Sequence, residues 1–246
     1  MLRGVAVSAD SNRVFVTRFV SPAANGEVYE VSASSLSLTR TFVLANDLGE
    51  ENVSDPDNSF NSRGVPNYLS SVVISPDGKR AWMPSKKDNV DRGLFKDGRT
   101  PSFESTTRTI ISPIDLVANT ELADERVDFN DSDSANAAVF SQYGDLLFVA
   151  LQGSNEVAVV DANQGTVIAT LMTEAAPQGL ALSNDGKLYV NNFLSRSVST
   201  FDVNAILNGG GNVLVRRNRR MLLPMSCCLQ RYSKVRKSST RRLICE

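Results

Sequence analysis

The sequence predicts an all-β protein, a β-propeller of about four four-stranded blades that form an incomplete, open ring. A turn phrase that begins with serine recurs four times, and stretches of alternating apolar and polar residues flank every copy. Windows of about 11 residues or more with the three- and four-residue apolar spacing of a helix are absent. Valine, threonine and serine dominate where a helix would favour alanine, leucine and glutamate. These observations exclude a helical fold.

The recurring phrase reads Ser-Ala-Asp-Ser-Asn, Ser-Pro-Asp-Gly-Lys, Ser-Gln-Tyr-Gly-Asp and Ser-Asn-Asp-Gly-Lys, starting at Ser8, Ser75, Ser141 and Ser183. Asp-Gly and its variants between two alternating stretches predict a β-hairpin. The serines are 67, 66 and 42 residues apart. The shortest spacing fits the roughly 40 to 45 residues of a four-stranded propeller blade. Repetition of such a unit favours blades around an axis over a two-sheet sandwich.

Two further strands are expected after each hairpin, except that the fourth copy loses its alternation at Gly209 after one of them. They are predicted at 27–31 and 36–44, 108–115 and 120–127, 156–161 and 166–171, and 197–203. The predicted propeller domain spans residues 1–208, with blades at about 3–45, 67–127, 134–173 and 176–208. Polar insertions at 46–66 and 86–106 account for the two longer spacings.

The fourth copy reads Pro-Gln-Gly-Leu-Ala-Leu-Ser-Asn-Asp-Gly-Lys-Leu-Tyr-Val-Asn-Asn over 177–192 and Ser-Val-Ser-Thr-Phe-Asp over 197–202. These two stretches resemble the YVTN-type β-propeller repeat of bacterial surface and periplasmic proteins. The third copy keeps Ser-Asn-Glu-Val-Ala-Val-Val-Asp over 154–161, and the second keeps Ser-Pro-Asp-Gly-Lys over 75–79. The resemblance implies that complete members form closed rings of about seven blades. The chain is therefore expected to be an internal piece of a longer, exported bacterial protein.

The resemblance implies two alternative roles. One is a non-catalytic binding or scaffold module whose ligand or protein partner is unknown. The other is the haem-free propeller portion of a periplasmic di-haem cytochrome c peroxidase-like electron-transfer protein, because some members join such a propeller to a c-type cytochrome. Haem c is expected only in a full-length parent, since covalent attachment needs Cys-x-x-Cys-His. Cys227, Cys228 and Cys245 lack that spacing, so no cofactor is expected in this chain.

The composition argues against most catalytic constellations. The chain has no histidine, which removes imidazole as a base and as a metal or haem ligand. Asp10, Asp77 and Asp185 lie in the hairpin turns, where turn chemistry explains them. No catalytic residue is predicted, and a binding role is favoured over an enzyme. Trp82 occupies the position of an aromatic residue in the other copies, which predicts a core side chain.

Two weak site hypotheses remain. Carboxylates and an amide that alternate as in calcium loops are found at Asp128, Asn130, Asp131 and Asp133. That stretch lacks the glycine and glutamate of an ion-binding loop, so a solvated loop is the competing interpretation. The second hypothesis is a ligand or partner contact in the 86–106 insertion, made by Arg92, Phe95, Lys96 and Arg99.

The C-terminal segment 209–246 differs from the rest in composition. Residues 1–215 carry 16 basic and 26 acidic side chains, whereas residues 216–246 carry 10 and 1. Clustered arginines are typical of tails that bind nucleic acid or anionic membranes. A shifted reading frame and a disordered extension are the alternatives, and a frame shift is preferred because the composition changes abruptly inside an unfinished blade. No apolar run approaches the roughly 20 residues of a membrane-spanning helix. No signal peptide is seen, so an exported location follows from the resemblance alone.

Overall fold

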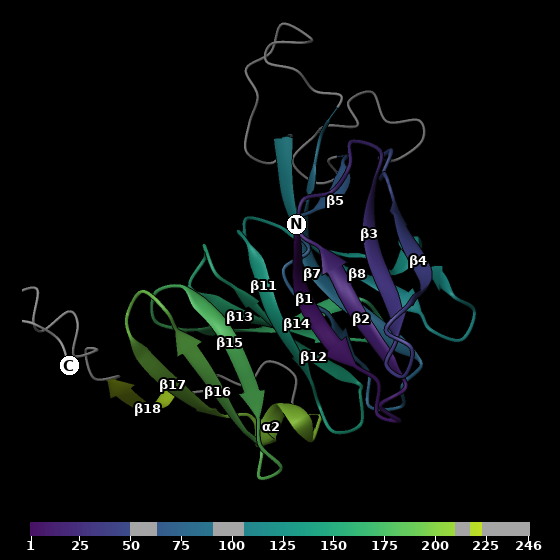
Figure 1. Cartoon of the computed structure of the whole chain (residues 1–246). Helices are drawn as coiled ribbons and strands as arrows, with labels where there is room; N and C mark the ends of the chain where they lie inside the picture. The colour runs from purple at the N-terminus through teal and green to yellow at the C-terminus, as the bar shows by residue number, and fades with distance from the viewer. Residues whose placement is uncertain (50–62, 91–105, 210–216, 223–246) are drawn as a thin grey trace, which may run out of the picture.

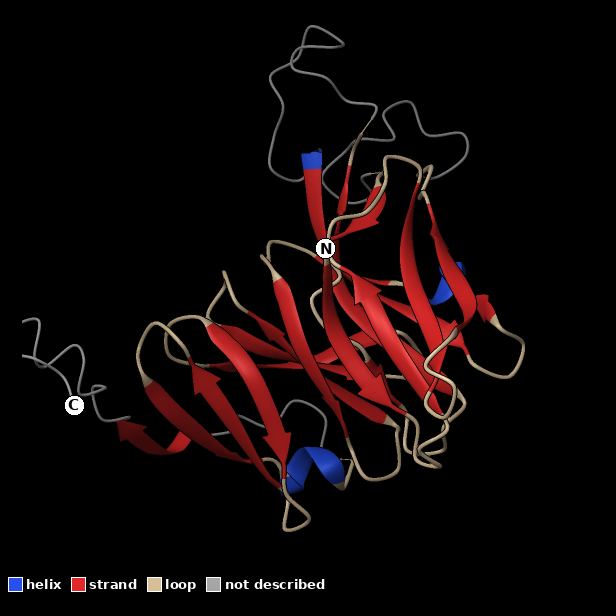
Figure 2. Ribbon diagram, viewed as in Figure 1, coloured by secondary structure: helices blue, strands red, loops and turns tan. Residues whose placement is uncertain are grey.

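The computed structural model describes residues 1–49, 63–90 and 106–209, together with the backbone of 217–222. Its strands form four antiparallel sheets that follow one another along the chain and lie side by side in an open arc (Figure 1). The helices named in the described residues are short pieces at the margins of the sheets, η1 (Ala123–Glu125) and α2 (Asn204–Leu207) (Figure 2). The predicted all-β architecture of four consecutive antiparallel sheets is confirmed, and three of the four sheets have the expected four strands.

Sheets one, three and four are meanders in which consecutive strands pair. Sheet one consists of β1 (Leu2–Val7), β2 (Arg13–Arg18), β3 (Asn25–Ser32) and β4 (Leu38–Ala45). Sheet three consists of β11 (Ala135–Phe140), β12 (Leu146–Leu151), β13 (Glu156–Asp161) and β14 (Thr166–Met172). Sheet four consists of β15 (Pro177–Leu182), β16 (Lys187–Asn192), β17 (Ser197–Asp202) and β18 (Arg217–Leu222).

Sheet two is irregular, because each of its two edges consists of two short strands instead of one long strand. Its two central strands are β7 (Arg80–Asp88) and β8 (Thr107–Asp115). The inner edge consists of β5 (Val65–Asn67) and β6 (Val73–Ile74), which both pair with β7. The outer edge consists of β9 (Thr120–Glu121) and β10 (Val127–Phe129), which both pair with β8. The single strand predicted over 120–127 is therefore wrong, since η1 separates its two halves.

The hairpin turns have the backbone geometry that their residues predict. Gly78, Gly144 and Gly186 have φ angles of 70°, 76° and 73°, in the left-handed region that glycine adopts without a steric penalty. The first copy has Ser11 in place of glycine, and it adopts a φ of 59°. The turn geometry is thus common to all four copies, although the first copy lacks the glycine.

The core lies between neighbouring sheets, and one aromatic position marks each interface. Phe15, Trp82 and Phe148 are 0%, 1% and 0% exposed, and each packs in the apolar cluster shared with the following sheet. The core prediction for Trp82 is confirmed. The equivalent Tyr189 is 40% exposed, because no sheet of the described chain follows the fourth one.

Two segment assignments need correction. The fourth sheet does have a fourth strand, since β18 pairs with β17 inside the region 209–246 that was expected to contain none. An edge strand offers unpaired backbone groups to any extended segment, and this pairing does not depend on side-chain alternation. The 86–106 insertion begins later than predicted, because β7 continues to Asp88 and buries Lys87 in ion pairs.

Candidate functional site

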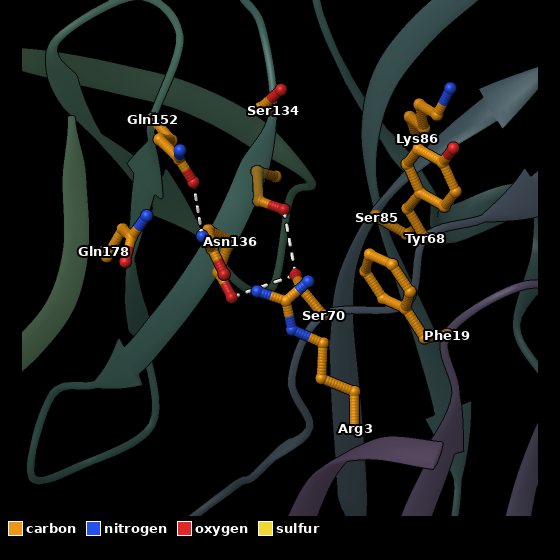
Figure 3. Close-up of a pocket in the computed structure, with 11 residues that line it drawn as sticks. Arg3, Phe19, Tyr68, Ser70, Ser85, Lys86, Ser134, Asn136, Gln152 and Gln178 are labelled. Carbon is orange, nitrogen blue, oxygen red and sulfur yellow. Dashed lines mark hydrogen bonds between the residues drawn. The ribbon is translucent and has the colours of Figure 1, made fainter. Parts of the chain in front are cut away.

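A cavity of about 210 Å³ opens at the inner edge of the arc, where the first strands of the sheets come together (Figure 3). One lining residue from each sheet occupies the same place in its repeat, five residues before the turn serine: Arg3, Ser70, Asn136 and Gln178. Three more lie eleven residues after that serine: Phe19, Lys86 and Gln152. The pocket therefore arises because the repeat brings equivalent positions of all four sheets to one place.

One wall of the pocket is a chain of aromatic and cationic side chains from sheets one and two (Figure 3). The Arg3 Cζ atom lies 4.4 Å from the centroid of the Phe19 ring. The Phe19 and Tyr68 rings stack with centroids 4.8 Å apart and an interplanar angle of 7°. The Lys86 Nζ atom lies 4.2 Å from the Tyr68 centroid. Cation–π contacts and ring stacking thus hold these four side chains in fixed relative positions.

Gly4 allows β1 to approach sheet two closely enough for this wall to form. A Cβ atom at Gly4 would lie 2.6 Å from the Cα atom of Ser71. The Gly4 N–H donates to the Thr17 Oγ1 atom at 2.8 Å, and the Thr17 hydroxyl donates to the Leu69 carbonyl at 2.8 Å. These bonds place Arg3 beside the segment that carries Tyr68 and Ser70.

Asn67 and Asp88 position the other end of the wall. The Asn67 Nδ2 group donates to Asp88 Oδ2 at 2.7 Å, and the Tyr68 N–H donates to Asn67 Oδ1 at 2.9 Å. Asp88 Oδ1 also lies 2.8 Å from Lys86 Nζ, so the lysine over the Tyr68 ring is already paired with a carboxylate. Lys86 therefore helps to position the Tyr68 ring, and its charge is already neutralised by Asp88.

Tyr68 has a φ of 52°, which is uncommon for a residue other than glycine. The equivalent residues of the next two sheets, Ser134 and Ala176, both have a φ of 59°. The left-handed conformation therefore belongs to the repeat and is not strain peculiar to the pocket.

The opposite wall of the pocket is built from amides (Figure 3). The Asn136 Nδ2 group donates to Gln152 Oε1 at 2.5 Å, which leaves the Gln152 amide nitrogen available to the pocket. Gln178 completes this wall from β15. Ser70 fastens the two walls together, because its Oγ atom lies 3.0 Å and 2.9 Å from the carbonyl oxygens of Ala135 and Asn136.

The lining of the pocket contains two cations and no carboxylate. Within the described residues, no carboxylate forms an ion pair with Arg3, in contrast to Lys86. The pocket therefore has an electropositive character that its amide donors reinforce.

A second polar cluster lies buried near the outer edge of sheet two. The side chains of Lys87 and Arg108 are each 1% exposed. Lys87 Nζ lies 2.6 Å from Asp47 Oδ2 and 3.0 Å from Asp128 Oδ2, and Arg108 Nε lies 3.3 Å from the same Asp128 oxygen. Burial acts to raise the pKa of Asp47, but the Lys87 ammonium group, the Gly49 N–H and the Arg126 charge together lower that pKa below its ordinary value. This cluster anchors the start of the 46–66 insertion to sheet two.

The calcium candidates are not gathered into one site. Asp128 faces Lys87 and Arg108, while Asp133 Oδ1 accepts a hydrogen bond from the Ser134 hydroxyl at 2.8 Å. Asn130 and Asp131 lie in the exposed turn after β10. In the described ranges, no group of three or more His, Cys, Asp or Glu residues is placed to hold a metal ion. Calcium binding stays a prediction without support from this geometry.

The predicted contact residues Arg92, Phe95, Lys96 and Arg99 lie outside the described residues. The inner pocket is not among the sites predicted from the sequence. The signal that could have found it is the repeat alignment, since equivalent positions at the start of each first strand must converge in a radial array.

No helix in the described part of the chain is long and apolar enough to cross a membrane. No family model matches the chain, and no curated protein sequence matches it.

Several solved structures share the fold. Hydrazine synthase from Kuenenia stuttgartiensis matches with a TM-score of 0.62 and 15% identity, over 81% of this chain and 58% of that chain. A periplasmic gluconolactonase from Pseudomonas aeruginosa matches with a TM-score of 0.56 and 21% identity, over 89% of this chain and 56% of that one. A proposed 6-phosphogluconolactonase from Bacteroides uniformis matches with a TM-score of 0.56 and 14% identity, over 91% of this chain and 55% of that one.

This chain spans little more than half the length of each of these proteins. At such low identity the likeness establishes the fold, a β-propeller, of which the four sheets form an open arc.

Proposed function

We propose that this chain is a non-catalytic, ligand-binding β-propeller module built from YVTN-type repeats, and that its ligand site is the inner pocket. The convergence of four equivalent residues, one from each sheet, carries the proposal. Pockets lined by a few converging polar groups beside aromatic side chains are the usual sites of small-molecule recognition. Arg3, Asn136 and Gln178 lie in the strands β1, β11 and β15, and Ser70 lies between β5 and β6. Strands of three sheets therefore give the site a rigid support.

The chemistry of the lining supports binding over catalysis. General acid–base catalysis needs a group that gives or takes a proton near neutral pH. The lining offers no carboxylate and no thiol, and its lysine is paired with Asp88. Two of the similar structures are named for lactone hydrolysis. Lactone hydrolysis is therefore the rival function that the experiment must test.

The experiment is a ligand-observed NMR screen of small metabolites against the chain, followed by a test for turnover of every binder. We expect binding without turnover, and loss of binding in Gln178→Trp, which fills the pocket with an indole ring. Tyr143→Trp is the matched control, because Tyr143 is 87% exposed outside this pocket. Turnover of a bound lactone, or binding that survives in Gln178→Trp, would contradict the proposal.

We also propose that the module belongs to a longer, exported bacterial protein. The incomplete arc and the greater length of the similar structures support a longer parent. The periplasmic location named for one of those structures supports export. The electron-transfer alternative stays a prediction about such a parent, because the haem attachment motif does not occur in these 246 residues.

A further inference from the structure

The Arg3 side chain has hydrogen-bond donors that the described part of the protein does not use. Its guanidinium group contacts the face of the Phe19 ring, and a contact of this kind does not consume the N–H donors at the edge of the group. Within the described residues, its side chain donates no hydrogen bond and forms no ion pair. The residue is exposed, so a ligand in the pocket can reach it.

The groups around Arg3 supply more donors. The Gln152 amide oxygen accepts the bond from Asn136, so the Gln152 amide nitrogen is the end of that side chain left for a ligand. Gln178 lies on the same wall and offers a second amide. A positively charged ligand would have no carboxylate to pair with in this lining, so the pocket disfavours cations.

The size of the cavity limits the ligand. About 210 Å³ corresponds to about seven water molecules at roughly 30 Å³ each. That volume suits a small organic acid. Arginine is the side chain best suited to carboxylates, because its planar fork forms two parallel hydrogen bonds with both oxygens.

We infer that the inner pocket binds a small organic carboxylate, with its anionic group on the edge of the Arg3 guanidinium and its polar substituents on the Gln152 and Gln178 amides. This inference rests on the proposed function and specifies the ligand class of the same site. Phe19 and Tyr68 act as the support that holds Arg3 in position.

The test compares acids with their uncharged isosteres. Lactate, malate and glucuronate, together with the primary amides lactamide, malamide and glucuronamide, are titrated into the chain by calorimetry at low and moderate salt. We expect at least one acid to bind about 10- to 100-fold more tightly than its amide, and less tightly as salt increases. Arg3→Gln should remove that difference, and Arg3→Lys should retain part of it.

Lys79→Gln is the matched control, because Lys79 is 69% exposed and lies outside the pocket. Equal binding of acid and amide would overturn the carboxylate assignment and leave the proposed binding function intact. An acid preference that survives in a folded Arg3→Gln variant would overturn the role of Arg3. Failure of all six compounds to bind would overturn the assignment, and only a blank metabolite screen would also remove the proposed function. If Arg3→Gln does not fold, the comparison of acids with amides on the unmodified chain still decides the ligand class.

Discussion

At the scale of single residues, each of the four hairpin turns contains a hydrogen bond from the turn serine to an aspartate, but the position of the aspartate varies. In three copies the turn serine donates to an aspartate two residues later, for example from Ser8 Oγ to Asp10 Oδ1 at 2.5 Å. The third copy has Tyr143 at that place, and Ser141 instead donates to Asp145 Oδ1 at 2.5 Å. Moving the acid by two residues keeps the bond and leaves the tyrosine side chain free in solvent.

The pKa of Asp10 gives a direct measure of this bond. The Ser8 hydroxyl and the Asn12 groups stabilise the carboxylate and lower the pKa of Asp10 to about 2. Because the folded-state pKa lies below the unfolded value, the stabilisation is present at neutral pH and is lost as pH falls toward 2. We expect Ser8→Ala to raise the pKa of Asp10 toward its ordinary value, and Ser8→Thr to leave it low. Carbon-13 NMR titration of the carboxyl measures both, and an unchanged pKa in Ser8→Ala would refute the assignment.

At the scale of elements, two glycines at equivalent positions of the first strands differ in how closely the neighbouring atoms approach them. Gly4 in β1 and Gly179 in β15 each lie four residues before the turn serine. A Cβ atom at Gly4 would meet the Ser71 backbone at 2.6 Å, whereas one at Gly179 would lie 3.5 Å from the nearest atom, Asn191 Cβ. The difference arises because sheet two packs against β1, while no described sheet follows sheet four.

This pair of glycines predicts opposite mutational outcomes. Gly4→Ala should lower the free energy of unfolding by about 1–3 kcal/mol, because the added methyl group collides with backbone that cannot move aside easily. Gly179→Ala should change it by less than about 0.5 kcal/mol, since its contact is ordinary and alanine restricts the unfolded chain. Urea unfolding followed by fluorescence of Trp82 compares the two. Equal losses in the two variants would show that the close contact between Gly4 and Ser71 does not decide the cost of the added methyl group.

At the scale of the whole molecule, stability is expected to vary along the arc. Strand β12 lies in a sheet with neighbours on both sides, and all six of its residues are buried. Strand β2 is its repeat equivalent in sheet one, and only two of its six residues are buried. The interfaces between sheets supply the apolar contacts, so an inner sheet has two of them and an end sheet of the described arc has one.

Amide hydrogen exchange should therefore be slower in the inner sheets of the arc than in its end sheets. Amides of β12 should exchange about tenfold more slowly than those of β2, which corresponds to about 1.4 kcal/mol of additional opening free energy. Mass spectrometry of peptides that cover 146–151 and 13–18 tests this on the full chain. Equal protection of the two strands would mean that the arc opens as one cooperative unit.

The fold class, the number of sheets and the hairpin turns could be predicted from the sequence, because alternation and turn chemistry are local properties of short segments. The core position of Trp82 could be predicted as well. Tertiary structure alone decided that β7 continues through Lys87, since two carboxylates from other segments neutralise that buried charge. It likewise decided that β18 completes the fourth sheet. The inner pocket also depends on the tertiary structure, because residues as distant as Arg3 and Gln178 meet only when four sheets are arranged around a common edge.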